Sequence, residues 1–448
     1  MRIGFATASA CALAVLLVGV QPATAAQRPP GKLDVIRAKA VKRAERVVEQ
    51  RNAIDVLKVS RCRPRRSARG KLNLGRWRCH WYAAGEFTGR VPYQCSGKAR
   101  WKRRKRAWRV DPCVNVLPPY APLRDVPNPH PMFGFNDDWH QRMARATNED
   151  ALTVLDRLDD VGADTVRIAV YWNSVEQDRG EFQWTESDLL DVIFEVSGIR
   201  PLWVVLGAPC WAQEGTCRGG VAPPAPTHVD EYGRFAAEVA SRYPRSAGIE
   251  IWNEPNYPRF WGDARPDPDR YGAMLTTAAA QIRQAVPSMP VVSGGLAPYA
   301  DTDPSAIGYR AYLERLYVLG AAQHADAIGI HPYPLVGPNQ DYIGDVRIQL
   351  GRIQIEMQKA GDSAPMWATE FGVSTTGPNA FPAEAQGPAL AQLYDTFRHT
   401  ERIDLAIIHR LIDAPHLGGN EAGFGILDDE LEPKPAFCSV AQVRGLPC

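Results

Sequence analysis

From about residue 132 onward, the chain alternates short apolar segments with longer segments whose apolar residues recur at helical spacing. The short segments are typical of buried strands, and the alternation indicates consecutive parallel βα units. Eight repeats predict an α/β fold, a (β/α)8 TIM barrel with its active site at the carboxyl ends of the strands. An open doubly wound sheet is the alternative, but its usual glycine-rich phosphate loop does not follow the first strand. The expected strands are 132–136, 165–171, 201–206, 248–252, 291–294, 327–331, 366–369 and 405–409.

The preceding part of the chain has a different pattern and a different charge. Residues 33–57 suggest one amphipathic helix, and short alternating stretches at 75–81 and 98–101 suggest small antiparallel strands. From Arg28 to Val110 the charge balance is 26 Lys+Arg − 5 Asp+Glu = +21, and from Asp111 to Cys448 it is 25 − 45 = −20. The formal net charge of +2 therefore conceals a basic α+β module joined to an acidic barrel.

The first 26 residues resemble a secretory signal peptide. Arg2 supplies the positive start, residues 6–20 form a short apolar run, and Ala23 and Ala25 fit the small-residue cleavage rule. A membrane anchor is the alternative, but the run is shorter than the roughly 20 residues that a spanning helix needs. We expect a protein that is secreted or associated with the cell wall, with no transmembrane anchor. Its segments are a signal peptide (1–26), a basic module (27–117), a proline-rich linker (118–131) and the barrel (132–448).

The cysteines favour disulfides. Cys11 leaves with the signal, and the remaining eight are an even number suited to an oxidising compartment. We expect bonds between residues 210 and 217 and between residues 438 and 448. The pairing within the basic module stays open, among Cys62, Cys79, Cys95 and Cys113. A zinc site is the alternative, but no C-x-x-C or nearby histidine pair supports it.

A basic run flanked by tryptophans, residues 101–108, invites a nucleic-acid interpretation. In an exported protein, an anionic cell-wall polymer or an acidic glycan is a better ligand, and nucleic acid is not expected. The structural alternative is a solvated hairpin tip whose tryptophans pack in a small core, which the four cysteines would help to hold together.

Two glutamates end two of the expected barrel strands. Glu254 follows Trp252 and Asn253 and precedes Pro255, which ends the strand, and Glu370 closes another apolar segment. In a barrel these two tips face each other across the mouth, so the carboxyl groups can converge. A pair about 5–5.5 Å apart hydrolyses a glycoside with retention of configuration, and a pair about 6.5–9.5 Å apart inverts it.

The barrel segment resembles the cellulase-like glycoside hydrolases of clan A, near families 5 and 39, over about three quarters of the chain. Five motifs in family order carry the resemblance, each at an expected strand end or in the closing segment. They are Ile-Trp-Asn-Glu-Pro-Asn at 251–256, Val-Ser-Gly-Gly at 292–295, Ile-Gly-Ile-His-Pro-Tyr at 328–333, Thr-Glu-Phe-Gly at 369–372, and Phe-Gly-Ile-Leu at 424–427 leading to Lys-Pro-Ala-Phe at 434–437.

The resemblance implies roles for the polar residues at the strand tips. Glu254 would be the acid/base and Glu370 the nucleophile, while Asn253 would bind the 2-hydroxyl of the sugar. Arg167 would pair with the nucleophile and lower its pKa, although a salt bridge between strands is an equal alternative. The chemistry agrees, because an acid that holds its proton near neutral pH benefits from an apolar neighbour such as Trp252, whereas a nucleophile benefits from cationic neighbours.

Further candidates complete the predicted rim. The resemblance implies that His331 and Tyr333 orient Glu370 or nearby sugar hydroxyls, although His331 could also be a core histidine. Asn136 adds a polar group at the first strand tip. Trp139 and Trp211 stand beside strand tips and are the expected sugar platforms.

One departure concerns the eighth strand, where relatives usually carry a tryptophan as the floor of the subsite. Alignment through Leu411 and Asp413 puts Ile408 in that place, which gives up contact with a ring face. We expect a monomeric retaining glycosidase acting on a β-linked carbohydrate, with no metal or organic cofactor, because two carboxylates suffice. The alternatives are a transglycosylase on the same fold and a non-catalytic protein that binds envelope glycan.

Overall fold

The computed structural model describes residues 58–66, 72–87, 91–102, 107–110, 131–139, 148–218, 221–298 and 304–448, the first four ranges as backbone. The chain divides into two compact units, Met1–Leu117 and Pro118–Cys448, and each is described by itself. The expected signal peptide, the helix at 33–57 and the proline-rich linker lie outside the described residues, apart from Pro131 at the linker's end.

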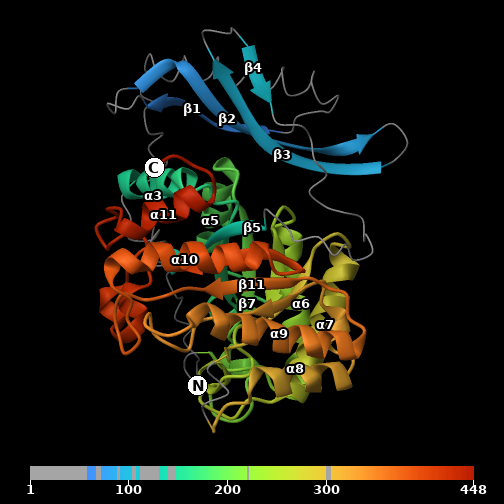
Figure 1. Ribbon diagram of the computed structural model, residues 1–448. Helices are drawn as coiled ribbons and strands as arrows, with labels where there is room; N and C mark the ends of the chain where they lie inside the picture. The colour runs from blue at the N-terminus through green and yellow to red at the C-terminus, as the bar shows by residue number, and fades with distance from the viewer. Residues whose placement is uncertain are drawn as a thin grey trace, which may run out of the picture. The chain divides into compact units, whose positions relative to one another are not determined.

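The first unit contains a four-stranded antiparallel sheet in the order β1-β2-β3-β4. Its strands are β1 (Lys58–Arg66), β2 (Leu72–Phe87), β3 (Val91–Lys102) and β4 (Ala107–Val110), and Figure 1 shows them as a twisted ribbon. The expected strands at 75–81 and 98–101 lie within β2 and β3. Trp101 and Trp108 are partners across β3 and β4, while residues 103–106 of the basic run lie outside the described residues. The bonding of the cysteines in this unit stays a prediction.

The second unit is an eight-stranded parallel barrel (Figure 1). Every expected strand is present, and the bounds differ from expectation by at most two residues, which confirms the predicted fold class. Proline, glycine and the change from apolar to polar residues mark the strand ends clearly. The strands are β5 (Met132–Asn136), β6 (Thr165–Tyr171), β7 (Arg200–Leu206), β8 (Gly248–Ile251), β9 (Val291–Ser293), β10 (Ile328–Ile330), β11 (Met366–Phe371) and β12 (Ile403–His409).

The barrel closes between β9 and β10 through two isolated bridges. Val292 pairs with Ala327, and Leu296 pairs with Ile330. The backbone N–H of Ser293 donates to the carbonyl of Ala327 at 3.1 Å. Further backbone N–H groups donate across the seam, from Asp326 to Val291 at 2.7 Å, from Leu296 to Gly329 at 3.3 Å and from His331 to Leu296 at 3.1 Å. The other seven neighbours in the ring pair as regular strands.

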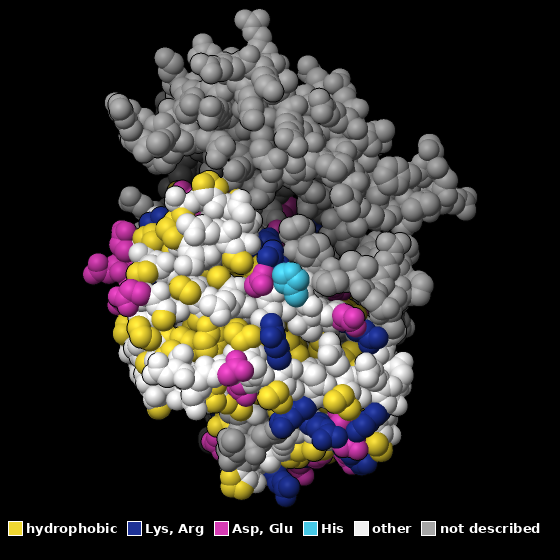
Figure 2. Space-filling view, viewed as in Figure 1, with side chains coloured by type: hydrophobic (Ala, Val, Ile, Leu, Met, Phe, Trp, Pro, Cys, Tyr) yellow, Lys and Arg dark blue, Asp and Glu magenta, His cyan; other side chains and the backbone are white. Residues whose placement is uncertain are grey.

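Helices surround the strands of the barrel (Figure 1). In α6, for example, Tyr232, Ala236 and Val239 recur at helical spacing and are buried against the barrel. Charged side chains of both signs lie on the outer face that Figure 2 shows. The helices are α3 (Asn148–Asp160), α4 (Trp172–Val175), α5 (Thr185–Val196), α6 (Val229–Arg242), α7 (Pro268–Ala285), α8 (Tyr309–Val318), α9 (Tyr342–Ala360), α10 (Ala383–Arg398) and α11 (Pro435–Val443).

Both disulfides expected in this unit are present. Cys210 is bonded to Cys217 within the loop between β7 and α6, and Cys438 in α11 is bonded to Cys448. Each bond closes a short loop and restrains it locally. Within the described part of the chain, no helix has the length and apolar character needed to cross a membrane.

Candidate active site

The backbone at the tip of β8 turns sharply to present Glu254. Trp252 has φ 73° and Glu254 has φ 41°, values that side chains other than glycine rarely adopt. Trp252 is fully buried, and its indole nitrogen donates to the carbonyl of Phe260 at 2.9 Å. Packing around the indole therefore holds a strained backbone next to Glu254, as is common at functional sites.

Glu370, in β11, is surrounded by hydrogen-bond donors. Arg167 donates to its Oε1 at 2.5 Å and Asn136 donates to the same oxygen at 2.9 Å. The hydroxyl of Tyr333 donates to Oε2 at 2.7 Å. Burial alone would raise the pKa of Glu370, but His331, Arg167 and the Tyr333 hydroxyl together lower it below its usual range. Glu370 is therefore held as a carboxylate.

Arg167 is held by a second carboxylate that sequence reasoning missed. Glu250, in β8, is fully buried and accepts from Nε of Arg167 at 2.7 Å and from Nη2 at 3.0 Å. Arg167 also donates to Oδ1 of Asn253 at 2.6 Å. Burial would lower the pKa of Arg167, but Glu250 and Glu370 raise it by more, so the net shift is upward. An acidic residue in the middle of an apolar strand was the available signal for this pairing.

The backbone N–H of Gly295 and the hydroxyl of Thr369 complete the surroundings of Glu250, donating to its Oε1 at 2.9 Å and 3.1 Å. All these partners donate, so both carboxyl oxygens of Glu250 accept hydrogen bonds. Arg167 thus bridges two carboxylates and an amide, and it serves both as an interstrand ion pair and as the cationic neighbour of Glu370.

His331 lies between the two glutamates. Its Nδ1 is 3.1 Å from Oε1 of Glu254 and 3.6 Å from Oε2 of Glu370. Its Nε2 is buried and has no hydrogen-bond partner among the described residues. A Cβ added at Gly295 would lie only 2.1 Å from Nε2, so glycine makes room for the ring. The imidazole therefore acts on the site through Nδ1.

One ligand atom each from Glu254, His331 and Glu370 lies within 4.8 Å of the other two, and this is the one such group found among the described residues that could hold a metal ion. The same atoms have protein partners, because Glu370 is paired with Arg167 and His331 contacts Glu254. We therefore interpret the group as two facing carboxyl groups linked by a histidine.

The tip of β12 presents His409 rather than Ile408 to the site. Ile408 is 1% exposed and packs in the hydrophobic core, which corrects the alignment made from the sequence. Nδ1 of His409 is 3.0 Å from Nδ2 of Asn136, and Nε2 is 3.1 Å from a carboxylate oxygen of Glu421. The ring also packs edge-on against Phe424, with centroids 5.0 Å apart. An imidazole therefore stands at the tip of β12, next to Asn136 and Glu421.

A buried cation beside His409 is neutralised locally. Arg410 donates to Asp138 at 2.6 Å and to Asp137 at 3.5 Å, and it lies 3.6 Å from Glu421. Burial would lower the pKa of Arg410, and the two aspartates raise it by more. The positive charge of Arg410 is therefore already balanced by neighbouring carboxylates.

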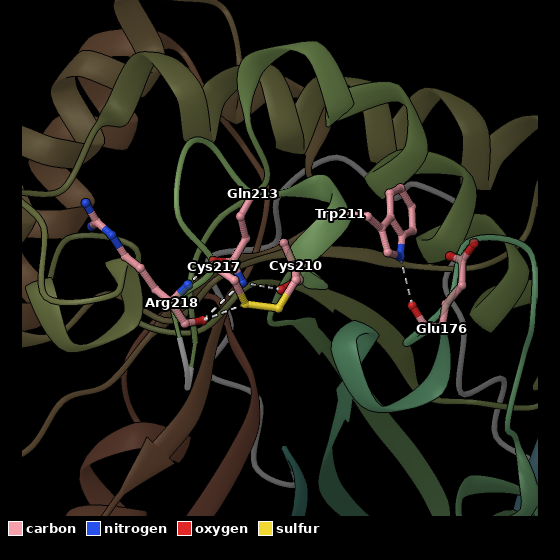
Figure 3. The surroundings of a disulfide bond; sticks show 7 residues. Glu176, Cys210, Trp211, Gln213, Cys217 and Arg218 are labelled. Carbon is pink, nitrogen blue, oxygen red and sulfur yellow. Dashed lines mark hydrogen bonds between the residues drawn. A yellow bond between two sulfur atoms is a disulfide. The ribbon is translucent and has the colours of Figure 1, made fainter.

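The two tryptophans expected as sugar platforms lie differently. Trp139 is 1% exposed, and its indole donates to the carbonyl of Arg167 at 3.0 Å, so the structure places it in the core instead. Trp211 is only half-buried. Its indole donates to the carbonyl of Glu176 at 3.2 Å, next to the Cys210–Cys217 disulfide (Figure 3), and Arg179 lies 5.4 Å from its ring centroid. Of the two, Trp211 alone offers ring surface to solvent.

The structure resembles solved glycoside hydrolases. A family 39 glycoside hydrolase from the gut symbiont Bacteroides cellulosilyticus WH2 matches 82% of this chain and 76% of its own, with TM-score 0.56 and 18% identity. A monomeric β-xylosidase from Caulobacter crescentus CB15 matches 73% and 70%, with TM-score 0.54 and 17% identity. A GH5_18 protein from Streptomyces cattleya in complex with Manb1-4GlcNAc matches 70% and 80%, with TM-score 0.52 and 18% identity.

No protein-family model matches the sequence, and no match is found among curated proteins. At these identities, the structural matches establish the fold alone. The expected resemblance to glycoside hydrolases of families 5 and 39 is thereby confirmed in the architecture of the barrel unit.

Proposed function

We propose that the barrel unit is a glycoside hydrolase that cleaves a β-linked O-glycoside with retention of configuration. The observation that carries this proposal is the pair of carboxyl groups at the tips of β8 and β11. An oxygen of Glu254 and an oxygen of Glu370 lie within 4.8 Å of each other. That approach of the two nearest oxygens supports a retaining pair over an inverting pair, whose carboxyl groups are farther apart.

The surroundings of the two carboxyl groups support different roles. Glu370 has Arg167, Asn136 and Tyr333 as donors and is held ionised, as a nucleophile requires. It would attack the anomeric carbon and form a glycosyl ester while Glu254 gives its proton to the departing oxygen. Glu254 would then take a proton from water, which attacks the anomeric carbon and releases Glu370.

Asn253 is oriented for substrate. Its Oδ1 accepts from Arg167, so the amide nitrogen is the group that remains to donate to a ligand, as expected for binding the 2-hydroxyl. Among the similar structures are a β-xylosidase and an exo-β-1,4-mannosidase, which supports a β-linked substrate. We further propose that the protein is exported and monomeric and that its basic module binds an anionic wall polymer, as the sequence predicts.

The proposal is tested with a panel of aryl β-glycosides and the full-length wild type, Glu370→Ala, Glu254→Ala and, as a control, Glu384→Ala, which changes an exposed residue of α10. Wild type and control should release the aryl alcohol from one sugar class, while Glu370→Ala should be inactive. Azide should then rescue Glu370→Ala with an α-glycosyl azide and Glu254→Ala with a β-glycosyl azide.

Products of hydrolysis and of transfer to added sugar are separated in the same assay. Dominant transfer would identify a transglycosylase. A wild type that cleaves no aryl glycoside, β-glucan, xylan or mannan but binds a glycan would overturn the proposal in favour of a binding protein.

A further inference from the structure

A chain of hydrogen bonds leads from a loop at the rim to Glu370. Glu421 lies in a 3-10 segment, η8 (Gly419–Gly423), and its Oε2 is 3.1 Å from Nε2 of His409. Nδ1 of His409 is 3.0 Å from Nδ2 of Asn136, and the same amide nitrogen donates to Glu370 at 2.9 Å. Neither Glu421 nor His409 belongs to the residues expected from the sequence.

The chemistry of the groups gives this chain one direction. A carboxylate only accepts, so Asn136 must present its NH2 group to Glu370. The second N–H of that group then points at Nδ1 of His409, which must accept with a lone pair. The proton of the neutral ring therefore sits on Nε2 and is donated to Glu421. Each polar group in the chain has a matching partner in this arrangement.

We propose that Glu421 and His409 are positioning residues that hold Asn136 as a donor to Glu370 by fixing the neutral Nε2–H tautomer of His409. The proposal rests on the proposed function, in which Glu370 is the nucleophile. Asn136 touches Glu370, whereas His409 and Glu421 act through it. An amide whose orientation is fixed keeps the attacking oxygen in place without adding a positive charge to the site.

The loop that carries Glu421 is fastened to the segment that follows β11. The hydroxyl of Ser374 donates to the carbonyl of Asn420 at 2.6 Å, and the hydroxyl of Thr376 donates to the carbonyl of Gly419 at 2.6 Å. The backbone N–H of Thr375 donates to the carbonyl of Gly423 at 2.9 Å. Glu370 and Glu421 are therefore carried by two segments that are held together.

A second proton on His409 would disrupt this arrangement. It would have to sit on Nδ1, where the N–H group of Asn136 already points, and it would face Glu370 at 3.7 Å instead. Four titratable or charged groups surround the ring: Glu370, Glu421, Arg410 and Tyr333. Burial lowers the pKa of His409, and the two carboxylates raise it by more. Activity should therefore fall as pH drops through the pKa of His409.

Nuclear magnetic resonance on the full chain with 15N-labelled histidine tests the proposal directly. His409 is assigned from the signal that His409→Asn removes. Wild type should show the neutral Nε2–H tautomer above the pKa of the ring. Glu421→Gln keeps an acceptor but removes the charge, so the pKa of His409 should fall by about one pH unit or more. A proton on Nδ1 in the neutral wild-type ring, or a pKa that Glu421→Gln leaves unchanged, would overturn the proposal.

The kinetic arm uses the aryl β-glycoside that wild type cleaves. Glu421→Gln should move the acid limb of kcat/KM to lower pH by the same amount as the ring titration, while the exposed control Glu430→Gln should leave it in place. Circular dichroism checks that each variant folds. If wild type cleaves no aryl glycoside, the proposed function fails, while the tautomer of His409 in wild type still decides this inference.

Discussion

Replacing Glu250 with glutamine should destabilise the barrel strongly, although the side chain keeps its size. Glu250 is fully buried, and its partner Arg167 is 3% exposed. Glutamine turns one acceptor oxygen into a donor, so at least one donor of Arg167, Gly295 or Thr369 loses its partner. Removing one member of a buried ion pair typically costs about 3–5 kcal/mol of unfolding free energy.

The matched control is Glu356→Gln, in α9. Glu356 is only 2% exposed, but its cationic partners Arg310 and Lys359 have side chains that are 50% and 54% exposed. Water can solvate those cations when the carboxylate is lost, so the expected cost is about 1 kcal/mol or less. The two variants make the same chemical change at similar depth and differ in the burial of the cation.

Thermal unfolding of the full chain, followed by circular dichroism at pH 7, separates the two cases. At about 2–4 °C per kcal/mol, Glu250→Gln should lower Tm by at least about 6 °C, and Glu356→Gln by less than about 4 °C. Equal losses in the two variants would refute the reasoning, because they would mean that Arg167, still paired with Glu370, does not need the second buried counter-charge of Glu250.

Three further predictions concern the groups around Glu370. Tyr333→Phe removes a hydrogen bond to a charged acceptor, worth about 1.5–3 kcal/mol, so kcat/KM should fall roughly 10- to 100-fold, and an unchanged value would contradict the role of the hydroxyl. Gly295→Ala puts a methyl group against His331 and should abolish cleavage by the folded variant, as an aryl-glycoside assay would show. Because folding lowers the pKa of Glu370, its ionised form contributes stability above the unfolded value of about 4.3 and loses it as pH falls. Glu370→Gln should thus flatten the dependence of Tm on pH between about pH 5 and pH 3, and parallel curves would contradict this.

The barrel strands could be predicted because the local signals agree with the tertiary structure. Pro255 ends the segment that carries Glu254, and apolar runs bounded by glycine or proline mark the other strands. The two glutamates and Arg167 could be predicted for a related reason, since a parallel barrel collects its strand tips at one rim.

Burial and pairing at the rim could not be predicted in the same way. Trp139 and Trp211 both stand beside strand tips in the sequence, but only packing decides that the first lies in the core. The inward residue of β12 depends on the strand register, in which His409 pairs with Asn136. Glu421 approaches His409 through a loop whose path no local pattern specifies.

The seam between β9 and β10 has a consequence for local opening of the barrel. Residues of this seam pair at two isolated bridges, whereas β6 and β7 pair continuously over seven residues. We therefore expect local opening of the ring to begin at the seam, and its amide hydrogens to exchange with solvent sooner than those of β6 and β7. Gly295 and His331 lie on the two sides of the seam. Glu254, which His331 contacts, therefore lies beside the part of the ring that we expect to open first, whereas Arg167 lies in a strand that pairs continuously with its neighbour.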